Sequence, residues 1–435
     1  MPSNEDNPLL WFRHAAPYIN AHRGRCFVVH FGGEAMIGPE FDGLVHDLAL
    51  LHSLGIRLLL VHGARPQIEQ RLEARGLHSR YHRNLRITDA DALQAVREAV
   101  GDLRIEIEAR LSQGIHNTPM SGARLRCVSG NLVTARPVGV LDGVDLQHTG
   151  EVRRIEAEAI HRHLAQGDIV LLSPLGYSPT GEVFNLAAEA VAVAAATALQ
   201  ADKLILLGHG ATLPGGRDQL DPARAAALAR DTALDDELRR HLRSAVGACR
   251  AGVPRVHLID RRRDGALLEE LFTREGAGVL VTADPWERLR PARIEDVGGI
   301  LELIQPLEQE GVLVRRSREQ LELEIDRFLV LERDGHIIGC AALYPFPEAG
   351  AGELACLVVH PDARGQGLAA RLLEAVEARA RDAGLNRLFV LTTRTAHWFR
   401  ERGFEPLPID DLPVDRRALY NLQRNSQAYM RKVAP

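Results

Sequence analysis

The sequence predicts an α/β protein in two parts: a larger N-terminal part with a mostly parallel sheet, and a smaller α+β part after it. The chain has 435 residues, which is too long for one ordinary hydrophobic core. Residues 25–284 alternate short apolar runs with helix-length stretches, the pattern of a parallel sheet covered by helices on both faces. From residue 292 the apolar runs follow one another and a glycine loop precedes one long helix, which is typical of a compact α+β domain.

In the N-terminal part we expect a buried strand wherever a run rich in Val, Ile and Leu stands between turn residues. These runs are RCFVVHF, RLLLVHG, GDIVLLSPLG, DKLILLGHG, VPRVHLID and GAGVLVT. Helices are expected between them, for example at RPQIEQRLEARG, TDADALQAVREAV and LAAEAVAVAAATALQ. Residues 1–24 carry apolar side chains at helical spacing, so we expect a separate N-terminal helix that packs on its own domain or on a neighbouring subunit.

Two prolines, Pro285 and Pro291, bracket a segment that we expect to be a linker over residues 285–291. The second domain then covers residues 292–435, after a first domain of residues 25–284. Its expected elements are two amphipathic helices, antiparallel strands in RFLVLERDGHIIGCAALYPF and GELACLVVHP, a long helix from Gly365 to Ala383, and a strand at LFVLTT.

Composition excludes several classes of protein. The formal net charge of −5 gives no reason to expect nucleic acid as a partner, and no apolar run approaches the roughly 20 residues that span a bilayer. The acidic start suits neither a secretory signal nor a transit peptide, so we expect a cytoplasmic protein. The five cysteines are scattered and the histidines form no H-E-x-x-H, so we expect reduced thiols and no metal.

The most informative segment is VVHPDARGQGLAARLL, in which an apolar strand runs into a glycine loop and a helix. Glycines let backbone N–H groups approach a diphosphate, and the helix N-terminus adds partial positive charge. The loop lacks the Lys-Ser/Thr end of a Walker motif and resembles the acyl-CoA site of GNAT acetyltransferases. The resemblance implies acetyl-CoA as co-substrate, bound by Leu357, Val359, Arg364, Gly365, Gln366, Gly367 and Ala369.

Acetyl transfer to an amine requires a base for the ammonium and an acid for the departing thiolate. Glu353, on the strand that leads to the loop, is the candidate base, acting directly or through one water. In many GNAT enzymes a tyrosine is the acid, but Phe399 stands at that position, so Thr392 and Thr393 are the nearest substitutes. A ping-pong route through Cys356 would need an activated thiolate, and its apolar neighbours argue against one.

Segments along nearly the whole chain resemble the family of bacterial N-acetylglutamate synthases: PYINAHRG, GVPRVHLIDRRRDGALLEELFTREGAG, LVRRSREQLE, LTTRTAHWFRERGF and LYNLQRNSQAY. This resemblance implies transfer of acetyl from acetyl-CoA to L-glutamate, the first step of arginine biosynthesis. It places Arg316 and Arg424 on the substrate carboxylates, which arginine holds bidentately, and puts Cys356 among the substrate-binding positions. It also implies a hexamer in which N-terminal helices link pairs of first domains.

The first domain resembles the amino-acid kinase fold, a three-layer sandwich, in VVHFGGEAM, VHGARPQI and FNLAAEAVA. Phosphoryl transfer requires cations on the moving charge, and the kinases supply lysines. Here His30 replaces the lysine of the first strand, Glu189 replaces an aspartate, and the chain's two lysines, Lys203 and Lys432, lie elsewhere. We therefore expect no kinase activity. The resemblance implies instead an inhibitory L-arginine site at Tyr18, His257, Glu270, Gly276 and Gly278.

Three other interpretations of the sequence stay open. One is an acetylglutamate kinase fused to an accessory domain, which the missing lysines disfavour. Another is a non-catalytic arginine sensor, which the intact glycine loop and Glu353 disfavour. The third is an acetyltransferase that acts on another amino acid or on a protein lysine.

Overall fold

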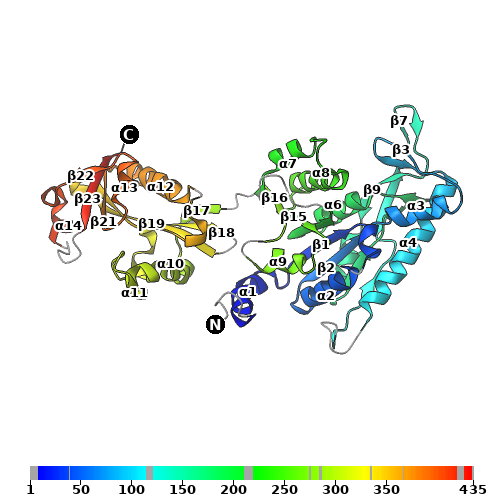
Figure 1. Cartoon of the computed structure of the whole chain (residues 1–435), viewed down its shortest axis with the longest axis horizontal. Helices are drawn as coiled ribbons and strands as arrows, with labels where there is room; N and C mark the ends of the chain where they lie inside the picture. Colours follow the sequence, from blue (N-terminus) through cyan, green and yellow to red (C-terminus); the bar gives the residue numbers. More distant parts are fainter. Residues whose placement is uncertain are drawn as a thin grey trace. The chain divides into compact units, whose positions relative to one another are not determined.

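The structure is a computed structural model, and it describes residues 8–38, 40–113, 121–209, 219–273, 276–283, 287–333, 336–365, 367–418 and 426–433. The chain divides into two compact units, Met1–Asp284 and Pro285–Pro435, which are described one after the other (Figure 1).

The first unit is built on an eight-stranded sheet in the order β14-β16-β15-β13-β1-β2-β10-β5. Its strands pair in parallel, except that β15 and β16 are antiparallel. Their bounds are β1 Cys26–Phe31, β2 Arg57–His62, β5 Cys127–Val128, β10 Ile169–Leu172, β13 Lys203–Gly208, β14 Gln219–Leu220, β15 Arg255–Asp260 and β16 Val279–Thr282. The apolar runs of the sequence therefore form the centre of this sheet, as expected for strands that are buried on both faces.

Alternate side chains of β1 divide the first unit into two cores. Val28 packs in one core with helices α6 and α8, whereas Phe27 and Val29 pack in the other with α1, α2 and α9. Figure 1 shows α6 and α2 on opposite sides of β1 and β2, which gives three layers. The helices are α1 Pro8–His22, α2 Glu40–Ser53, α3 Arg65–Glu73, α4 Ala90–Leu111, α5 Ala157–Ala165, α6 Ala188–Ala198, α7 Pro222–Leu228, α8 Asp236–Arg250 and α9 Ala266–Phe272, with the 3-10 turn η2 Gly33–Met36.

Smaller sheets complete the first unit. A four-stranded sheet has the order β12-β11-β6-β9, and two short ribbons pair β3 with β4 and β7 with β8. Their bounds are β3 Arg80–His82, β4 Leu85–Ile87, β6 Val133–Pro137, β7 Val140–Leu141, β8 Val144–Asp145, β9 Gly150–Ile155, β11 Leu175–Tyr177 and β12 Val183–Asn185.

The second unit contains a seven-stranded sheet in the order β17-β18-β19-β20-β21-β23-β22, antiparallel except between β20 and β21. The strands are β17 Glu287–Pro291, β18 Phe328–Arg333, β19 His336–Phe346, β20 Ala351–Val359, β21 Arg387–Thr392, β22 Glu405–Leu407 and β23 Gln427–Lys432. The helices are α10 Val297–Gln309, α11 Arg318–Leu323, α12 Leu368–Asp382, α13 Ala396–Arg400 and α14 Val414–Ala418, with 3-10 turns η3 Ile294–Asp296, η4 Ile325–Arg327, η5 Pro347–Ala349, η6 Pro361–Ala363 and η7 Ile409–Asp411.

Helices cover both faces of this second sheet. The core on one face includes side chains of α10 and α11, and the core on the other face includes those of α12. Cys356 and Val358 of β20 point to the α10 face, whereas Leu354 points to the α12 face. The two faces matter for function because the candidate site residues are divided between them.

The expected linker over residues 285–291 is wrong for its greater part. Residues 287–291 form β17, an edge strand that pairs antiparallel with β18 and sets Leu289 opposite Leu331. Arg290 anchors this strand through ion pairs with Asp296 and Glu332, both 2.6 Å long. Pro291 is tolerated because it ends an edge strand, where a missing N–H costs no internal ladder bond. The long helix also begins later than expected, at Leu368, because Gly365 and Gly367 have left-handed backbones.

Among the described helices, none combines the length and the apolar character that a bilayer span requires.

Candidate active site

Strand β20 is interrupted by a bulge that separates it from its parallel neighbour. The β19–β20 register shifts between Ala355 and Val358, and Cys356 within the bulge has φ +49°, a left-handed backbone rare for a residue other than glycine. Strand β21 pairs with β20 only over Ala351–Leu354. The two strands therefore diverge at the bulge, and the backbone of Leu357 and Val359 lies along the opening.

The glycine loop follows at once. Gly365 has φ +79° and Gly367 has φ +78°, and Gly367 occupies the N-cap of α12 without any side-chain cap bond. The first turn of α12 therefore presents backbone N–H groups that a bound anion can use. Arg364 is exposed beside them and donates from Nε to the carbonyl of Val359 at 3.4 Å. Ala369 lies half-buried in the first turn of the helix, and Gln366 lies outside the described residues.

On the α10 face of the sheet, Arg316 stands in the segment before α11. Its backbone N–H donates to Glu308 Oε1 at 3.0 Å, and its Nη1 donates to the carbonyl of Val314 at 3.0 Å. Its charge acts on Tyr344 and on Cys356, so the guanidinium lies beside the bulge. Burial, together with a 2.6 Å hydrogen bond to Glu324, raises the pKa of Tyr344, so this phenol stays protonated.

Glu353 is a buried carboxylate held in a two-pronged ion pair. Arg416 of α14 donates from Nε to one carboxylate oxygen at 2.5 Å and from Nη2 to the other at 3.0 Å. The Glu353 side chain is 10% exposed, so water competes little with this pair. Sequence reasoning missed Arg416, because no local pattern links a residue of α14 to a strand so far away in the chain.

The two candidate threonine acids differ in their surroundings. Thr392, at the end of β21, is buried; its hydroxyl accepts a hydrogen bond from the N–H of Thr395 at 3.0 Å and lies 2.8 Å from the Thr395 hydroxyl. Thr393 is exposed. Phe399 packs edge-on between Trp398 and Phe404, as part of the hydrophobic core. Arg424, the second expected carboxylate ligand, lies outside the described residues.

Cys356 is chemically quiet in this setting. Burial raises the pKa of its thiol to about 11, although the Arg316 charge acts in the opposite direction. The thiol is therefore protonated near neutral pH and is a poor nucleophile, which agrees with the expectation that no acyl-cysteine forms.

Four of the five expected arginine-site residues in the first unit lie together. Glu270 of α9 accepts a 2.6 Å hydrogen bond from His257 Nδ1 at one oxygen. Its other oxygen accepts the backbone N–H groups of Ala277 and Gly278 at 2.7 and 2.8 Å. A Cβ at Gly276 would lie 2.7 Å from Glu270 Oε2, and one at Gly278 only 2.4 Å from the Leu258 carbonyl, so both positions require glycine. Tyr18, the fifth, lies on α1, which packs against α9.

Lys203, the first residue of β13, also belongs to this network. Its ammonium lies 3.2 Å from His257 Nε2 and 5.8 Å from the Phe27 ring centroid. Burial, and the Lys203 charge after it, lower the pKa of His257. Because an ammonium group only donates, Nε2 accepts from Lys203 while Nδ1 donates to Glu270.

The kinase-like loops of the first unit line a separate pocket of about 100 Å³ at the other end of the parallel sheet. His30, the last residue but one of β1, lines this pocket together with Gly32 and Gly33, Arg65 and Glu189. Among the described residues of the first unit, no lysine lines this pocket, because Lys203 starts β13 at the His257 end of the sheet. The pocket thus keeps the shape of a phosphate site without its lysines.

A GNAT sheet with a bulged strand and a glycine loop, following a kinase-fold unit, defines an acetyltransferase with a fused amino-acid kinase-like domain. Sequence models agree: that of the amino acid kinase family matches residues 25–260, and that of the acetyltransferase (GNAT) family matches residues 298–404. The chain belongs to the amino-acid acetyltransferases. One such enzyme, from Azotobacter vinelandii, is 59% identical over 96% of this chain and 98% of its own length. Another, from Pseudomonas aeruginosa strain LESB58, is 58% identical over 97% of this chain and 99% of its own.

Solved structures give the same answer. The crystal structure of N-acetylglutamate synthase from Neisseria gonorrhoeae complexed with coenzyme A and L-arginine has a TM-score of 0.89 at 39% identity, covering 99% of this chain and all of that one. A second structure of that synthase, complexed with coenzyme A and N-acetyl-glutamate, has a TM-score of 0.62 at 40% identity over the same shares. The expected fold class is confirmed for both domains.

Proposed function

We propose that this enzyme transfers the acetyl group of acetyl-CoA to the α-amino group of L-glutamate, producing N-acetyl-L-glutamate and CoA, the first step of arginine biosynthesis. The observation that carries the proposal is the Glu353–Arg416 pair on β20, with Glu353 and Arg316 both acting on Cys356 in the bulge, next to a glycine loop. The complexes of the Neisseria synthase with coenzyme A and N-acetyl-glutamate support the same pair of substrates.

Acetyl-CoA would bind where β20 and β21 diverge. The backbone of Leu357 and Val359 would hold the pantetheine arm, and the N–H groups from Gly365 to Ala369 would hold the diphosphate. The neutral thiol of Cys356 leaves direct attack by the amine as the simplest route, in which the N–C bond forms and the C–S bond breaks without an acyl-enzyme.

The substrate's two carboxylates call for two cations. Arg316 is placed for one of them beside the bulge, and Arg424 is the second expected ligand. Arg416 is a further candidate, because a substrate carboxylate that joined it would compete with Glu353 for the guanidinium and leave that carboxylate freer to accept a proton.

Glu353 would take the proton from the substrate ammonium, directly or through a water molecule. The Arg416 fork fixes the orientation of its carboxylate, which a positioned base requires. Thr392 would return a proton to the thiolate, because its hydroxyl is oriented by Thr395, whereas no described residue hydrogen-bonds the exposed Thr393 hydroxyl.

L-Arginine would act as feedback inhibitor at the first unit. Glu270 offers a buried carboxylate for a guanidinium, and Gly276 and Gly278 let the loop backbone pack closely around it. The complex of the Neisseria synthase with L-arginine supports this role. A cytoplasmic location and a hexameric assembly complete the proposal, and sedimentation velocity of the purified chain tests the latter.

The decisive experiment follows thiol release from acetyl-CoA with each of several amino acids, with and without L-arginine. Glutamate should be the preferred acceptor, and arginine should slow the reaction. If CoA were released with another amino acid but not with glutamate, the substrate assignment would be wrong. Consumption of ATP in the presence of N-acetylglutamate would restore the kinase interpretation.

A further inference from the structure

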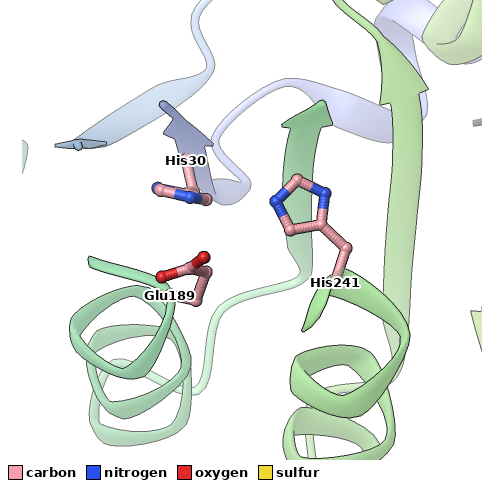
Figure 2. A group of neighbouring side chains, drawn as sticks. All are labelled: His30, Glu189 and His241. Carbon is pink, nitrogen blue, oxygen red and sulfur yellow. The ribbon is translucent and has the colours of Figure 1, made fainter. Parts of the chain in front are cut away.

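We propose that His30, Glu189 and His241 form a binding site for a divalent first-row transition-metal ion of the Zn²⁺ type in the first unit. One donor atom from each side chain lies within 4.8 Å of the other two. Figure 2 shows the three side chains pointing toward one another from three different elements. The proposal concerns the kinase-like pocket and is independent of the acetyl-transfer assignment.

The fold brings these residues together at one end of the parallel sheet. His30 is in β1, just before the glycine pair; Glu189 is in the first turn of α6, and His241 is in α8. His30 is 2% exposed and His241 is 3% exposed. Burying two imidazoles side by side costs free energy unless the ring nitrogens have hydrogen-bonding or metal partners, so this arrangement requires an explanation.

The His30 ring is oriented as a metal ligand. Its Nδ1 lies 3.1 Å from the carbonyl of Val61 and must donate to it, because a carbonyl only accepts. The remaining nitrogen, Nε2, then carries a lone pair. A backbone carbonyl that fixes the tautomer in this way is the usual second partner of a metal-bound histidine.

The His241 ring is held in place but has no hydrogen-bonding partner. Among the described residues, neither of its nitrogens makes a hydrogen bond, although the side chain is almost completely buried. It packs on Gly208, where a Cβ would lie only 2.5 Å from His241 Cε1. The ring points toward His30 and Glu189 in Figure 2, so one of its nitrogens is a donor atom of the cluster.

Glu189 supplies the negative charge. One of its carboxylate oxygens is the third donor atom of the cluster. Arg240 donates to one of its oxygens at 3.3 Å. Arg240 and Arg65 both oppose a cation here, so we expect moderate affinity, with the metal on the carboxylate oxygen that Arg240 does not hold.

The donor set selects the type of ion. Two imidazoles and one carboxylate suit zinc and its neighbours, whereas Mg²⁺ and Ca²⁺ prefer oxygen ligands alone. Zinc bonds to such donors are about 2.0–2.2 Å long, so the side chains must draw together when the ion binds. A surrounding cavity of about 100 Å³ leaves space for water in the remaining position. The ion would join β1, α6 and α8 and stabilise the first unit.

The test uses the full-length protein after treatment with a chelator. Titration with Zn²⁺, followed by calorimetry, should give one saturable site, and Co²⁺ should give the visible spectrum of a nitrogen–oxygen site without the sulfur charge-transfer band of a cysteine ligand. Glu189→Gln and His241→Gln should each weaken binding by about tenfold or more, since even outer-shell changes cost that much. The melting temperature of the wild type, but not of the variants, should rise with Zn²⁺.

His163→Gln is the matched control. His163 forms a 3.0 Å pair with Asp168 but has no third ligand, so its loss should leave Zn²⁺ affinity unchanged. Equal Zn²⁺ affinity in the wild type and in both ligand variants, or no saturable binding at all, would overturn the proposal. Circular dichroism of each variant reports whether it is folded. Failure of thiol release from acetyl-CoA would concern the proposed acetyl transfer rather than the metal site.

Discussion

At the scale of single residues, Glu353 combines a proposed chemical role with an evident structural one. The carboxylate is buried and forked to Arg416, so a neutral replacement removes both a base and half of an ion pair. If Glu353 were only a structural partner, its replacement would change the stability of the protein and leave the pH dependence of the rate intact. If Glu353 is the base, its replacement should leave binding of acetyl-CoA intact and remove the lower limb of the pH–rate profile.

Glu353→Gln should therefore lower kcat by roughly 10²–10⁴-fold, the usual effect of losing a general base. The KM for acetyl-CoA should change little, because the glycine loop lies beyond the bulge. Steady-state thiol release across pH measures both quantities. Glu348→Gln, an exposed position on η5, is the control. A wild-type kcat in the Glu353 variant would remove it as the base.

Arg316→Ala should raise the KM for glutamate far more than the KM for acetyl-CoA. A charged hydrogen bond to a carboxylate contributes about 1.5–3 kcal/mol, or roughly 10- to 150-fold in affinity. The neighbouring Arg318 is the control, because its side chain is 66% exposed and pairs only with Glu322 within its own helix. Substrate titrations of both alanine variants test this difference; similar KM values for glutamate in both would exclude a carboxylate-binding role for Arg316.

At the scale of elements, substitutions of the two glycines that flank α12 distinguish the effect of backbone strain from the effect on cofactor binding. Gly367 before the helix and Gly384 after it have φ +78° and φ +72°, and a Cβ at either would meet open space. An alanine at each should cost about 1–2 kcal/mol of stability for the left-handed backbone. Only Gly367→Ala should also raise the KM for acetyl-CoA, by several-fold, since only that end faces the proposed diphosphate. Thermal melts and acetyl-CoA titrations measure the two effects, and an equal rise in KM for Gly384→Ala would contradict the assignment.

Helix α1 is attached to the first unit through a histidine that cannot be charged in place. His22 Nε2 lies 2.8 Å from the Leu271 carbonyl, and its ring packs edge-on against Phe27 and Phe272. Burial, and then the charge of Lys203, lower its pKa to about 4 from an ordinary 6.5. Between these values the unfolded chain binds more protons than the folded one, so stability present above pH 6.5 is lost as the pH falls toward 4.

Acidification from pH 7.5 to 5 should therefore cost about 2 kcal/mol through His22 alone, at about 1.4 kcal/mol per pH unit below 6.5. Calorimetric melts at the two pH values should show a smaller decrease for His22→Gln than for the wild type. His14→Gln, on the exposed side of α1, should behave like the wild type. An equal decrease in the wild type and in His22→Gln would show that His22 is not the group that titrates.

The sequence predicts elements best where the signal is local. Apolar runs predict the central strands of the first sheet. R-G-Q-G-L-A predicts the loop before α12, because the backbone conformation that glycine allows is a local property of the sequence. Sequence patterns do not predict strand β17, because the five residues Glu287–Pro291 carry charges and a proline and gain their stability only from pairing with β18. The Arg416–Glu353 fork and the His30–Glu189–His241 cluster depend on contacts between distant segments, for which no spacing rule exists.

At the scale of the whole molecule, the first unit has a fold whose transferring lysines are absent and whose two polar centres lie at opposite ends of the same sheet. One end holds His30 and the glycine loops, and the other holds the network of Lys203, His257 and Glu270. A ligand bound at the Glu270 end affects the activity of the other unit only if it binds two arrangements of the chain with different affinity. The proposed inhibition by arginine would thus be a property of the full chain.

Glu270→Gln should abolish inhibition by L-arginine and leave kcat without arginine near the wild-type value. The substitution removes the charge that contacts Ala277 and Gly278, yet keeps an oxygen that can accept their N–H groups. Loss of a buried charged partner should weaken arginine binding by roughly 10- to 150-fold, equivalent to about 1.5–3 kcal/mol. Glu269→Gln is the control, since that carboxylate is 36% exposed and pairs with Arg263. Thiol release at increasing arginine concentration, with calorimetric binding beside it, distinguishes the two variants. Unchanged inhibition in Glu270→Gln would place the arginine site elsewhere, and unchanged binding without inhibition would instead make Glu270 part of the coupling between the units.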